Sequence, residues 1–165
     1  MSTSLKHRYT PDWRWASLFC VGAVLLIVVG AGAHPLPTDL PETGPDIVQP
    51  EELVKLLQSK AEKPLLLQVG SHVLYAQAHI PASEYVGSAS SDSSLQRLRK
   101  RVQSLPRDKP IVIYCGCCPW KHCPNVQPAY DALRSMGFTS VKVLHLANNL
   151  GADWVDKGYP VAKGD

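Results

Sequence analysis

Short apolar runs alternate with amphipathic stretches along most of the chain. The runs Leu65–Val69 and Ile111–Tyr114 each follow a proline, and the first one ends at a glycine. A short, mostly apolar run bounded in this way is typical of a strand that is buried on both faces of a sheet. A third strand is predicted at Ser140–Leu146, where valine and leucine predominate.

Helical spacing of apolar residues separates these strands. In the clearest case, apolar residues recur at steps of three and four over Leu95–Leu105 and stop before Pro106, which predicts a helix. Residues 71–94 are expected to be mostly irregular, with a helical turn at Val73–Gln77 and a short strand near Glu84–Val86. Strands that alternate with helices indicate a parallel α/β sheet with helices on both faces. Helices are also predicted at three other places, Glu51–Leu57, Asn125–Met136 and Ala152–Val155.

The N-terminal region has a different pattern. No charged residue interrupts residues 16–33, and a run of this length is near the lower limit for a helix that crosses a bilayer. Basic residues precede the run, whereas the flank after it carries only acidic charges as far as Lys55. The positive-inside bias then predicts that residues 1–15 stay in the cytoplasm and that the rest of the chain crosses the membrane.

Two interpretations of residues 16–33 stay open. Ala31-Gly32-Ala33 fits the small-residue pattern of a signal-peptidase site. The long polar lead, with Trp13 at its inner edge, is instead typical of an uncleaved anchor. Either way, the expected location is extracytoplasmic, anchored in the membrane or secreted to the periplasm.

Prolines recur in residues 34–46, where apolar content is low. This composition predicts a stiff, extended linker. The remaining residues, 47–163, are enough for one ordinary domain. A 165-residue chain of this kind therefore predicts a tethered or exported single domain.

The net charge and its distribution argue against nucleic-acid binding and say little about other functions. The formal net charge is +3, and the basic residues are dispersed apart from the run Arg97–Arg101. That run lies on a predicted helix, where it is typical of a solvated face. No nucleic-acid partner is expected.

Four of the five cysteines fall within nine residues, directly after the apolar run that ends at Tyr114. A cluster of thiols at the carboxyl end of a buried strand, with a helix following, points to sulfur or metal chemistry. In an extracytoplasmic compartment, unpaired thiols also meet oxidising conditions. The four residues are Cys115, Cys117, Cys118 and Cys123.

Several local strings, taken in order, resemble the rhodanese (sulfurtransferase) domain family over roughly residues 47–162. The resemblance implies a three-layer α/β domain with a central parallel sheet flanked by helices, here preceded by one N-terminal hydrophobic helix. The matching strings are Gln49-Pro50-Glu51-Glu52-Leu53, Ala78-His79-Ile80-Pro81, Ile111-Val112-Ile113-Tyr114-Cys115, Met136-Gly137-Phe138, Asp153-Trp154 and Gly158-Tyr159-Pro160-Val161.

The resemblance also implies a reaction. Cys115 takes the position of a nucleophile that accepts a sulfane sulfur as a persulfide, from thiosulfate or a persulfide donor, and passes it to a thiol acceptor. No cofactor is expected. Independently, a thiol at a strand end that faces a helix N-terminus is expected to have a lowered pKa. Lys121 and His122 are predicted to add positive charge in the loop.

Three departures from the family pattern bear on the activity. The chain has Gln68-Val69-Gly70 where the family usually shows an Asp-Val-Arg-like string, and Ala78 replaces a glycine. The loop after Cys115 is also several residues longer than the family's compact ring of amides. No arginine lies between Cys115 and Arg134, which counts against the phosphatase and arsenate-reductase relatives of the fold.

The extra loop cysteines have several interpretations that the sequence leaves open. Cys117, Cys118 and Cys123 are predicted to act as resolving or relay thiols, leaving a disulfide for a thioredoxin-like reductant. They could instead form a structural disulfide, in which pairing of the adjacent Cys117 and Cys118 would be strained. A third interpretation is a copper or zinc site built from these thiols with Cys115 and His122. A fourth is a catalytically silent interaction domain.

Two further residues are predicted to be structural. His79 is expected to hold the His-Ile-Pro turn rather than act as a base, and Trp154 is expected to pack the final helix on the core.

Overall fold

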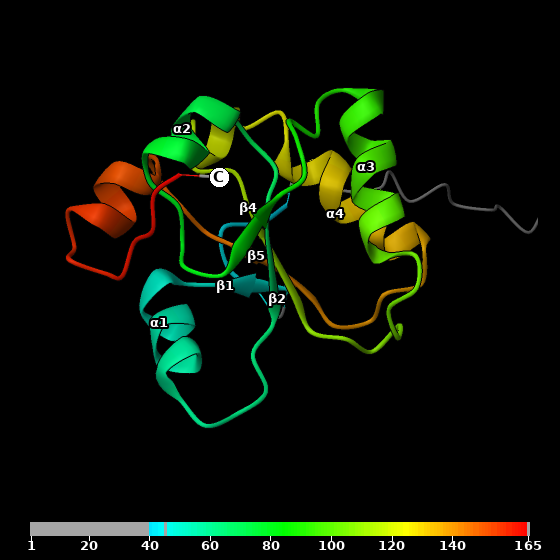
Figure 1. The fold of residues 1–165 in the computed structure, drawn as a ribbon, viewed down its shortest axis with the longest axis horizontal. Coiled ribbons are helices and arrows are strands. Elements are labelled where there is room, and N and C mark those ends of the chain that lie inside the picture. Colours follow the sequence, from blue (N-terminus) through cyan, green and yellow to red (C-terminus); the bar gives the residue numbers. More distant parts are fainter. Residues whose placement is uncertain (1–39, 45, 165) are drawn as a thin grey trace, which may run out of the picture. The chain divides into compact units, whose positions relative to one another are not determined.

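In the computed structural model, which describes residues 40–44 and 46–164, five parallel strands form one sheet in the order β1-β5-β4-β2-β3 (Figure 1). Each strand is short, and Gln68 at the end of β2 pairs with Tyr114 at the end of β4. The strands are β1 (Ile47–Val48), β2 (Leu65–Gln68), β3 (Ser83–Tyr85), β4 (Ile111–Tyr114) and β5 (Val141–Leu144).

Helices cover both faces of the sheet, which gives the predicted three-layer arrangement. Figure 1 shows α3 and α4 on one side of the sheet, with α1 and the final helical turn, η3, on the other. The helices are α1 (Pro50–Gln58), α2 (His72–Gln77), α3 (Asp92–Val102) and α4 (Val126–Ser135), joined by the 3₁₀ turn η2 (Trp120–His122) and the π-helical turn η3 (Gly151–Val155).

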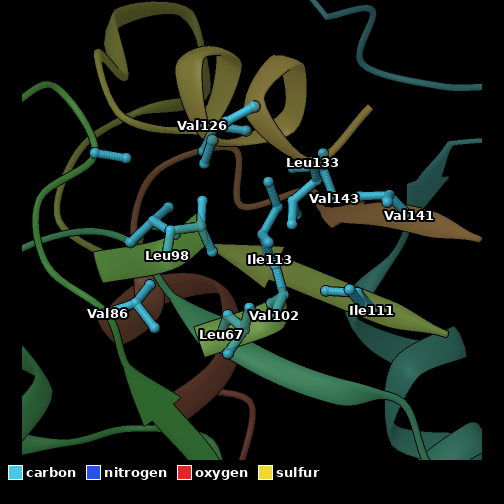
Figure 2. Close-up of a cluster of buried hydrophobic side chains, with 14 of the residues drawn as sticks. Leu67, Val86, Leu98, Val102, Ile111, Ile113, Val126, Leu133, Val141 and Val143 are labelled. Atoms are coloured by element: carbon cyan, nitrogen blue, oxygen red, sulfur yellow. The ribbon is translucent and has the colours of Figure 1, made fainter. Parts of the chain in front are cut away.

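Alternating side chains of the central strands point into two separate hydrophobic cores, one on each face of the sheet. Ile111 and Ile113 of β4 point into the core beneath α3 and α4 (Figure 2), whereas Val112 and Tyr114 point into the core that contains Trp154. All four β4 residues are therefore buried. This confirms the prediction of a strand covered on both faces, because period-two side chains must fill a core on each side.

The prediction that Trp154 packs the final helix is confirmed as well. Its side chain is fully buried, and its indole Nε1 donates a hydrogen bond to the Pro160 carbonyl oxygen.

Element boundaries differ from the sequence prediction in three places. The two-residue strand β1 was not predicted, because it precedes α1 without a recognisable run. In the stretch 71–94, α2 and β3 confirm the predicted helical turn and short strand, but each begins one residue earlier than predicted. Helix α3 starts at Asp92 and ends at Val102, three residues early at both ends. Leu105 precedes Pro106, and this position disfavours helical backbone.

The predicted N-terminal helix at residues 16–33 lies outside the described residues. Within residues 40–44 and 46–164, no helix is long and apolar enough to cross a membrane.

The chain order of the strands fixes where a site can form. After β3 the chain returns to the other side of β2 to make β4, so β2 and β4 flank a point where the direction of strand addition reverses. The carboxyl ends of strands diverge at such a point, and ligands bind there in open α/β sheets. Cys115 follows β4 directly and Gly70 follows β2, so both lie at this edge.

The Tyr114 hydroxyl ties the end of β4 to the turn after α2. It accepts a hydrogen bond from the Ile80 backbone N–H at 3.2 Å and lies 2.8 Å from the Ser83 hydroxyl. Burial raises the pKa of Tyr114 to about 12, so the phenol stays neutral. We expect Tyr114→Phe to lower the free energy of unfolding by about 1–3 kcal/mol, because the buried Ile80 N–H loses its partner. Urea unfolding measures this loss.

Tyr159→Phe is the matched control, since its hydroxyl contacts the Glu51 carboxylate near the surface. Its unfolding midpoint should stay unchanged. Equal effects of the two variants would contradict a structural role for the Tyr114 hydroxyl.

Candidate functional site

The cysteine loop leaves the sheet at Cys115 and folds back on itself at Gly116. Gly116 has a φ of +56°, a left-handed conformation that side chains disfavour. Its carbonyl oxygen accepts a hydrogen bond from the Leu150 backbone N–H, and a Cβ atom at Gly116 would lie 3.0 Å from the Leu150 Cβ. The turn therefore requires glycine, and it places Cys117 beside Cys115.

Three sulfur atoms of the loop form a compact cluster. The Sγ atom of Cys115 lies 3.0 Å from that of Cys117 and 3.8 Å from that of Cys118, and the last two are 3.5 Å apart. Cys115 is 3% exposed, whereas the other loop cysteines are partly exposed, and all four are free. The structure thus brings together the predicted nucleophile and two of the predicted relay thiols.

Asn125 is a further site residue that the sequence did not reveal. Its Oδ1 accepts hydrogen bonds from the Ser88 hydroxyl and the Ser90 backbone N–H. These contacts turn its Nδ2 toward the thiols, where it donates to Cys115 Sγ at 3.3 Å. A fixed amide donor of this kind favours negative charge on the sulfur. Sequence spacing suggested only that Asn125 begins a helix.

The fourth loop cysteine lies at the start of α4. The backbone N–H groups of Asn125 and Val126 donate to the Cys123 sulfur, as does the thiol of Cys115. The Cys115 contact is the largest effect, and together these donors outweigh burial and lower the pKa of Cys123 to about 6. The N–H groups at the start of α4 therefore favour negative charge on Cys123.

The lowered pKa predicted for Cys115 is wrong. The Cys123 thiolate that it contacts and the burial of its side chain both raise the pKa of Cys115, and the backbone N–H of Cys117 offsets only part of this. Burial is also the main cause that raises the pKa of Cys118 to about 12. Because α4 starts eleven residues beyond Cys115, its first N–H groups reach Cys123 instead.

A cavity of about 470 Å³ opens beside Cys123. Trp120 and Lys121 of the loop form one wall, and the Lys121 Nζ lies 3.5 Å from the Glu42 Oε1 across it. The Lys121 side chain is 77% exposed, and His122 is exposed too. Both residues therefore lie at the surface, and Lys121 lines the Cys123 cavity.

A second cavity, of about 320 Å³, opens beside Cys117. It lies between the loop and α2, and its polar lining comes from the amide side chains of Gln68, Gln77 and Asn149. Leu74 and Val155 at its edge are partly exposed apolar residues. The two cavities thus meet the thiol cluster at different cysteines.

Comparison with known proteins places this architecture in a family. A family model for the Rhodanese-like domain matches residues 49–147, more than half of the chain. The chain belongs to the rhodanese-like domain family. A search of curated proteins found no match.

Solved rhodanese-like structures share the fold. The rhodanese-like domain of an Anabaena sp. protein is 22% identical, with a TM-score of 0.53, and the match covers 72% of this chain and 79% of that one. A Bacillus halodurans protein is 19% identical, with a TM-score of 0.55 and coverage of 71% and 76%. A single-domain sulfurtransferase from Saccharomyces cerevisiae is 18% identical, with a TM-score of 0.52 and coverage of 73% and 100%. At these identities, the likeness concerns the fold alone.

The rhodanese-like pattern is altered at the end of β2 in a way that the structure explains. A Cβ atom at Gly70 would lie 2.9 Å from the Cys115 sulfur, so a larger residue would displace that thiol. Gln68 is buried, and its Oε1 accepts a hydrogen bond from the Gly70 backbone N–H. A neutral amide and a glycine thus stand where the family's acid and arginine are usual.

Other predicted residues of the rhodanese-like domain lie away from the thiols. His79 is buried, its Nδ1 lies 2.9 Å from the Tyr75 carbonyl oxygen, and its ring stacks on Tyr75, which supports the predicted structural role. Arg134 donates to the Phe138 and Thr139 carbonyl oxygens beyond the C-terminal end of α4. It therefore does not close the loop around an anion.

The same cluster has the donor atoms of a metal site. Cys115, Cys117 and Cys118 offer three sulfur atoms that all lie within 4.8 Å of one another. Thiolates at such spacing suit a soft cation such as Cu(I), or Zn(II). A rhodanese-like domain with this cluster supports sulfurtransferase or thiol chemistry in general.

The Asn125 amide gives a direct test of the site's electrostatics. In Asn125→Asp, one oxygen still accepts from Ser88 and Ser90, but the group facing Cys115 changes from an N–H donor to a carboxylate oxygen. Negative charge beside a thiolate disfavours its ionisation. We expect Cys115 to react with iodoacetamide about tenfold more slowly at pH 7, since its pKa is already raised above its ordinary value and a further rise of one unit lowers its thiolate fraction about tenfold.

Gln103→Glu adds the same charge at an exposed position just after α3 and should leave the rate unchanged. Wild-type reactivity in Asn125→Asp would show that the amide does not control the thiols.

Proposed function

We propose that this rhodanese-like protein transfers sulfane sulfur through a persulfide on Cys115. The observation that carries the proposal is the position of Cys115, directly after β4 at the reversal point of the sheet, with other thiols within 4 Å. The backbone N–H of Cys117 and the Asn125 amide both point at its sulfur. They would stabilise the negative charge of a persulfide there.

The neighbouring thiol of Cys117 can release the outer sulfur of the persulfide within the protein. The Cys117 sulfur attacks the Cys115 sulfur, a Cys115–Cys117 disulfide forms, and the outer sulfur leaves with both protons as hydrogen sulfide. The contact of 3.0 Å between the two sulfurs supports this route. An external dithiol of the thioredoxin-like class then reduces the disulfide. Alternatively, an external thiol attacks the outer sulfur and takes it up directly.

The proposal includes an extracytoplasmic location. It rests on the uncharged residues 16–33 and the basic residues before them. In that compartment, a disulfide left in the loop would persist until a dedicated reductant reaches it.

Replacing the nucleophile tests the proposed reaction. Cys115→Ser should reduce sulfur transfer from thiosulfate or an organic persulfide to background, because a hydroxyl cannot hold the sulfane sulfur. The measurement is the release of sulfide or transfer to an added thiol, with the reduced full-length protein. Cys20→Ser is the matched control, since it makes the same change outside the loop and should keep the activity. Full transfer by Cys115→Ser would refute the role of Cys115.

A second function, soft-metal binding, is favoured by the three clustered sulfurs. The raised pKa values of Cys115 and Cys118 reflect burial and crowding by neighbouring thiols. A bound cation would compensate these negative charges and release the protons. In this function, Cys115, Cys117 and Cys118 hold the metal, and no turnover follows.

Metal analysis separates the two functions. If the loop binds metal, the reduced full-length protein should compete for about one Cu(I) per chain with a coloured Cu(I) chelator, under anaerobic conditions. Cys118→Ser should weaken this binding by about tenfold or more, because one of three soft ligands is lost, while Cys20→Ser should not. A protein that purifies free of copper and zinc and fails to compete would contradict the metal site.

A further inference from the structure

The two sulfurs of the proposed disulfide differ in how a partner can reach them. Cys115 is 3% exposed, whereas Cys117 is partly exposed and lines the cavity of about 320 Å³ between the loop and α2. Their sulfurs lie 3.0 Å apart, so a disulfide bond of about 2 Å forms with a movement of about 1 Å. Cys117 therefore stays at the cavity after the disulfide has formed.

This difference decides which sulfur is attacked when the disulfide is reduced. In thiol–disulfide exchange, a thiolate attacks one of the two sulfurs, and the rate depends on access to that sulfur. The Cys117 sulfur borders a cavity, and the Cys115 sulfur is buried. An external thiol therefore meets Cys117 first.

The chemistry of this cavity favours a peptide as its occupant. Among the residues that line it, none is charged, and three carry side-chain amides, Gln68, Gln77 and Asn149. Gln68 and Asn149 each accept a backbone hydrogen bond through the amide oxygen, which leaves their N–H groups as donors for peptide carbonyl oxygens. Small thiols such as cysteine and glutathione carry charged groups, which would lose hydration here without a countercharge.

Exposed apolar side chains lie on the elements around the same cavity. Leu74 of α2 and Val155 of η3 line it, and the C-terminal segment pairs with the chain just after α2. Figure 1 shows η3 and this segment, in orange and red, beside α2. Apolar side chains grouped in this way are typical of a protein interaction site. Among residues 40–44 and 46–164, the exposed large apolar side chains are those of Val73, Leu74, Val155 and Val161.

We infer that the partner is a dithiol protein, which places an uncharged, cysteine-bearing segment in this cavity and attacks the Cys117 sulfur. The inference rests on the proposed sulfur transfer and specifies how the loop is reduced after sulfide has left. The partner thiolate attacks Cys117, a disulfide between the partner and Cys117 forms, and the Cys115–Cys117 bond breaks. The electron pair of that bond leaves with the Cys115 sulfur, which takes up a proton from water.

The second thiol of the partner completes the reduction. It attacks the partner's own sulfur in the mixed disulfide, and the bond to Cys117 breaks. The electron pair and the proton of the attacking thiol go to the Cys117 sulfur. The partner is thereby oxidised from a dithiol to a disulfide, and the loop regains two thiols. Leu74 and Val155 contact the partner during both steps.

A partner with a single cysteine identifies the attacked sulfur. Reduced full-length protein is treated with one equivalent of cysteine persulfide, which should release sulfide and leave the loop disulfide. Thioredoxin with its second active-site cysteine replaced by serine is then added, the mixture is quenched with acid, and free thiols are alkylated. The partner should be attached to Cys117, with Cys115 alkylated. Fragmentation of the tryptic peptide 108–121, which holds Cys115, Cys117 and Cys118, assigns the position by mass spectrometry.

A charge beside the cavity tests the docking surface. Val155→Glu should slow reduction by intact thioredoxin about tenfold or more, because a carboxylate there disfavours an uncharged apolar segment. Reduction by dithiothreitol, a small neutral dithiol, should keep its wild-type rate. Gln103→Glu is the matched control, since it adds the same charge at an exposed position after α3, on the other side of the sheet. It should leave both rates unchanged.

A comparison of small thiols tests the class of partner. At equal thiolate concentration, the uncharged capped peptide Ac-Leu-Cys-Gly-NH2 should reduce the loop disulfide faster than glutathione, which carries charged groups. A faster reaction with glutathione would overturn the uncharged peptide segment as the occupant of the cavity.

The remaining outcomes distinguish this inference from the proposed function. A mixed disulfide on Cys115 or Cys118, or a Cys115 persulfide that never gives a disulfide, would overturn the inference and leave sulfur uptake by Cys115 intact. In Val155→Glu, an unchanged rate with thioredoxin, or an equal loss with dithiothreitol, would refute docking at this surface. If the protein takes up no sulfur from cysteine persulfide and releases no sulfide, the proposed function itself is wrong.

Discussion

The structure depends on a constraint at the end of β4, where four thiols share one partly buried loop and cannot all carry charge. Like charges within 4 Å in a medium of low dielectric constant repel strongly. The sulfurs of Cys115, Cys117 and Cys118 are that close, and Cys123 contacts Cys115 as well. The group therefore favours a single negative charge, and the first N–H groups of α4 lower the pKa of Cys123 and favour that charge on its sulfur.

The altered residues around the loop are consistent with this single charge. An arginine at Gly70 would have no room beside the Cys115 sulfur, and an acid at Gln68 would add a second charge close to it. Asn125 supplies a neutral donor in their place, and its orientation is fixed by Ser88 and Ser90. Because these neighbouring residues are neutral, the thiols determine one another's protonation. The charged side chains that are usual beside the nucleophile in this family are thus replaced by an amide and by neighbouring sulfur atoms.

The fold could be predicted from the sequence where the signal is local. Runs such as Ile111–Tyr114 have apolar side chains for both faces, so their burial in a parallel sheet follows from the pattern alone. The two-residue strand β1 has no such signal, because it pairs with β5, which lies almost a hundred residues further along the chain. In the site, too, local features could be predicted from the sequence, whereas features that depend on distant residues could not. Clustering of Cys115, Cys117 and Cys118 follows from their spacing, but the direction of the Asn125 amide depends on Ser88 and Ser90, which belong to a distant loop.

The lowered pKa was predicted for Cys115 but is found at Cys123, and the length of the loop explains this difference. In a short loop, the cysteine after the strand also lies at the first turn of the next helix, so one residue is both buried nucleophile and helix-stabilised anion. Here the insertion moves the start of α4 to Val126 and separates these two properties. Cys115 keeps the position at the end of the strand, and Cys123 takes the N–H groups of the helix and the larger cavity. Cys115 is buried and its raised pKa disfavours charge, so its chemistry depends on the neighbouring thiols, of which Cys117 lies 3.0 Å away.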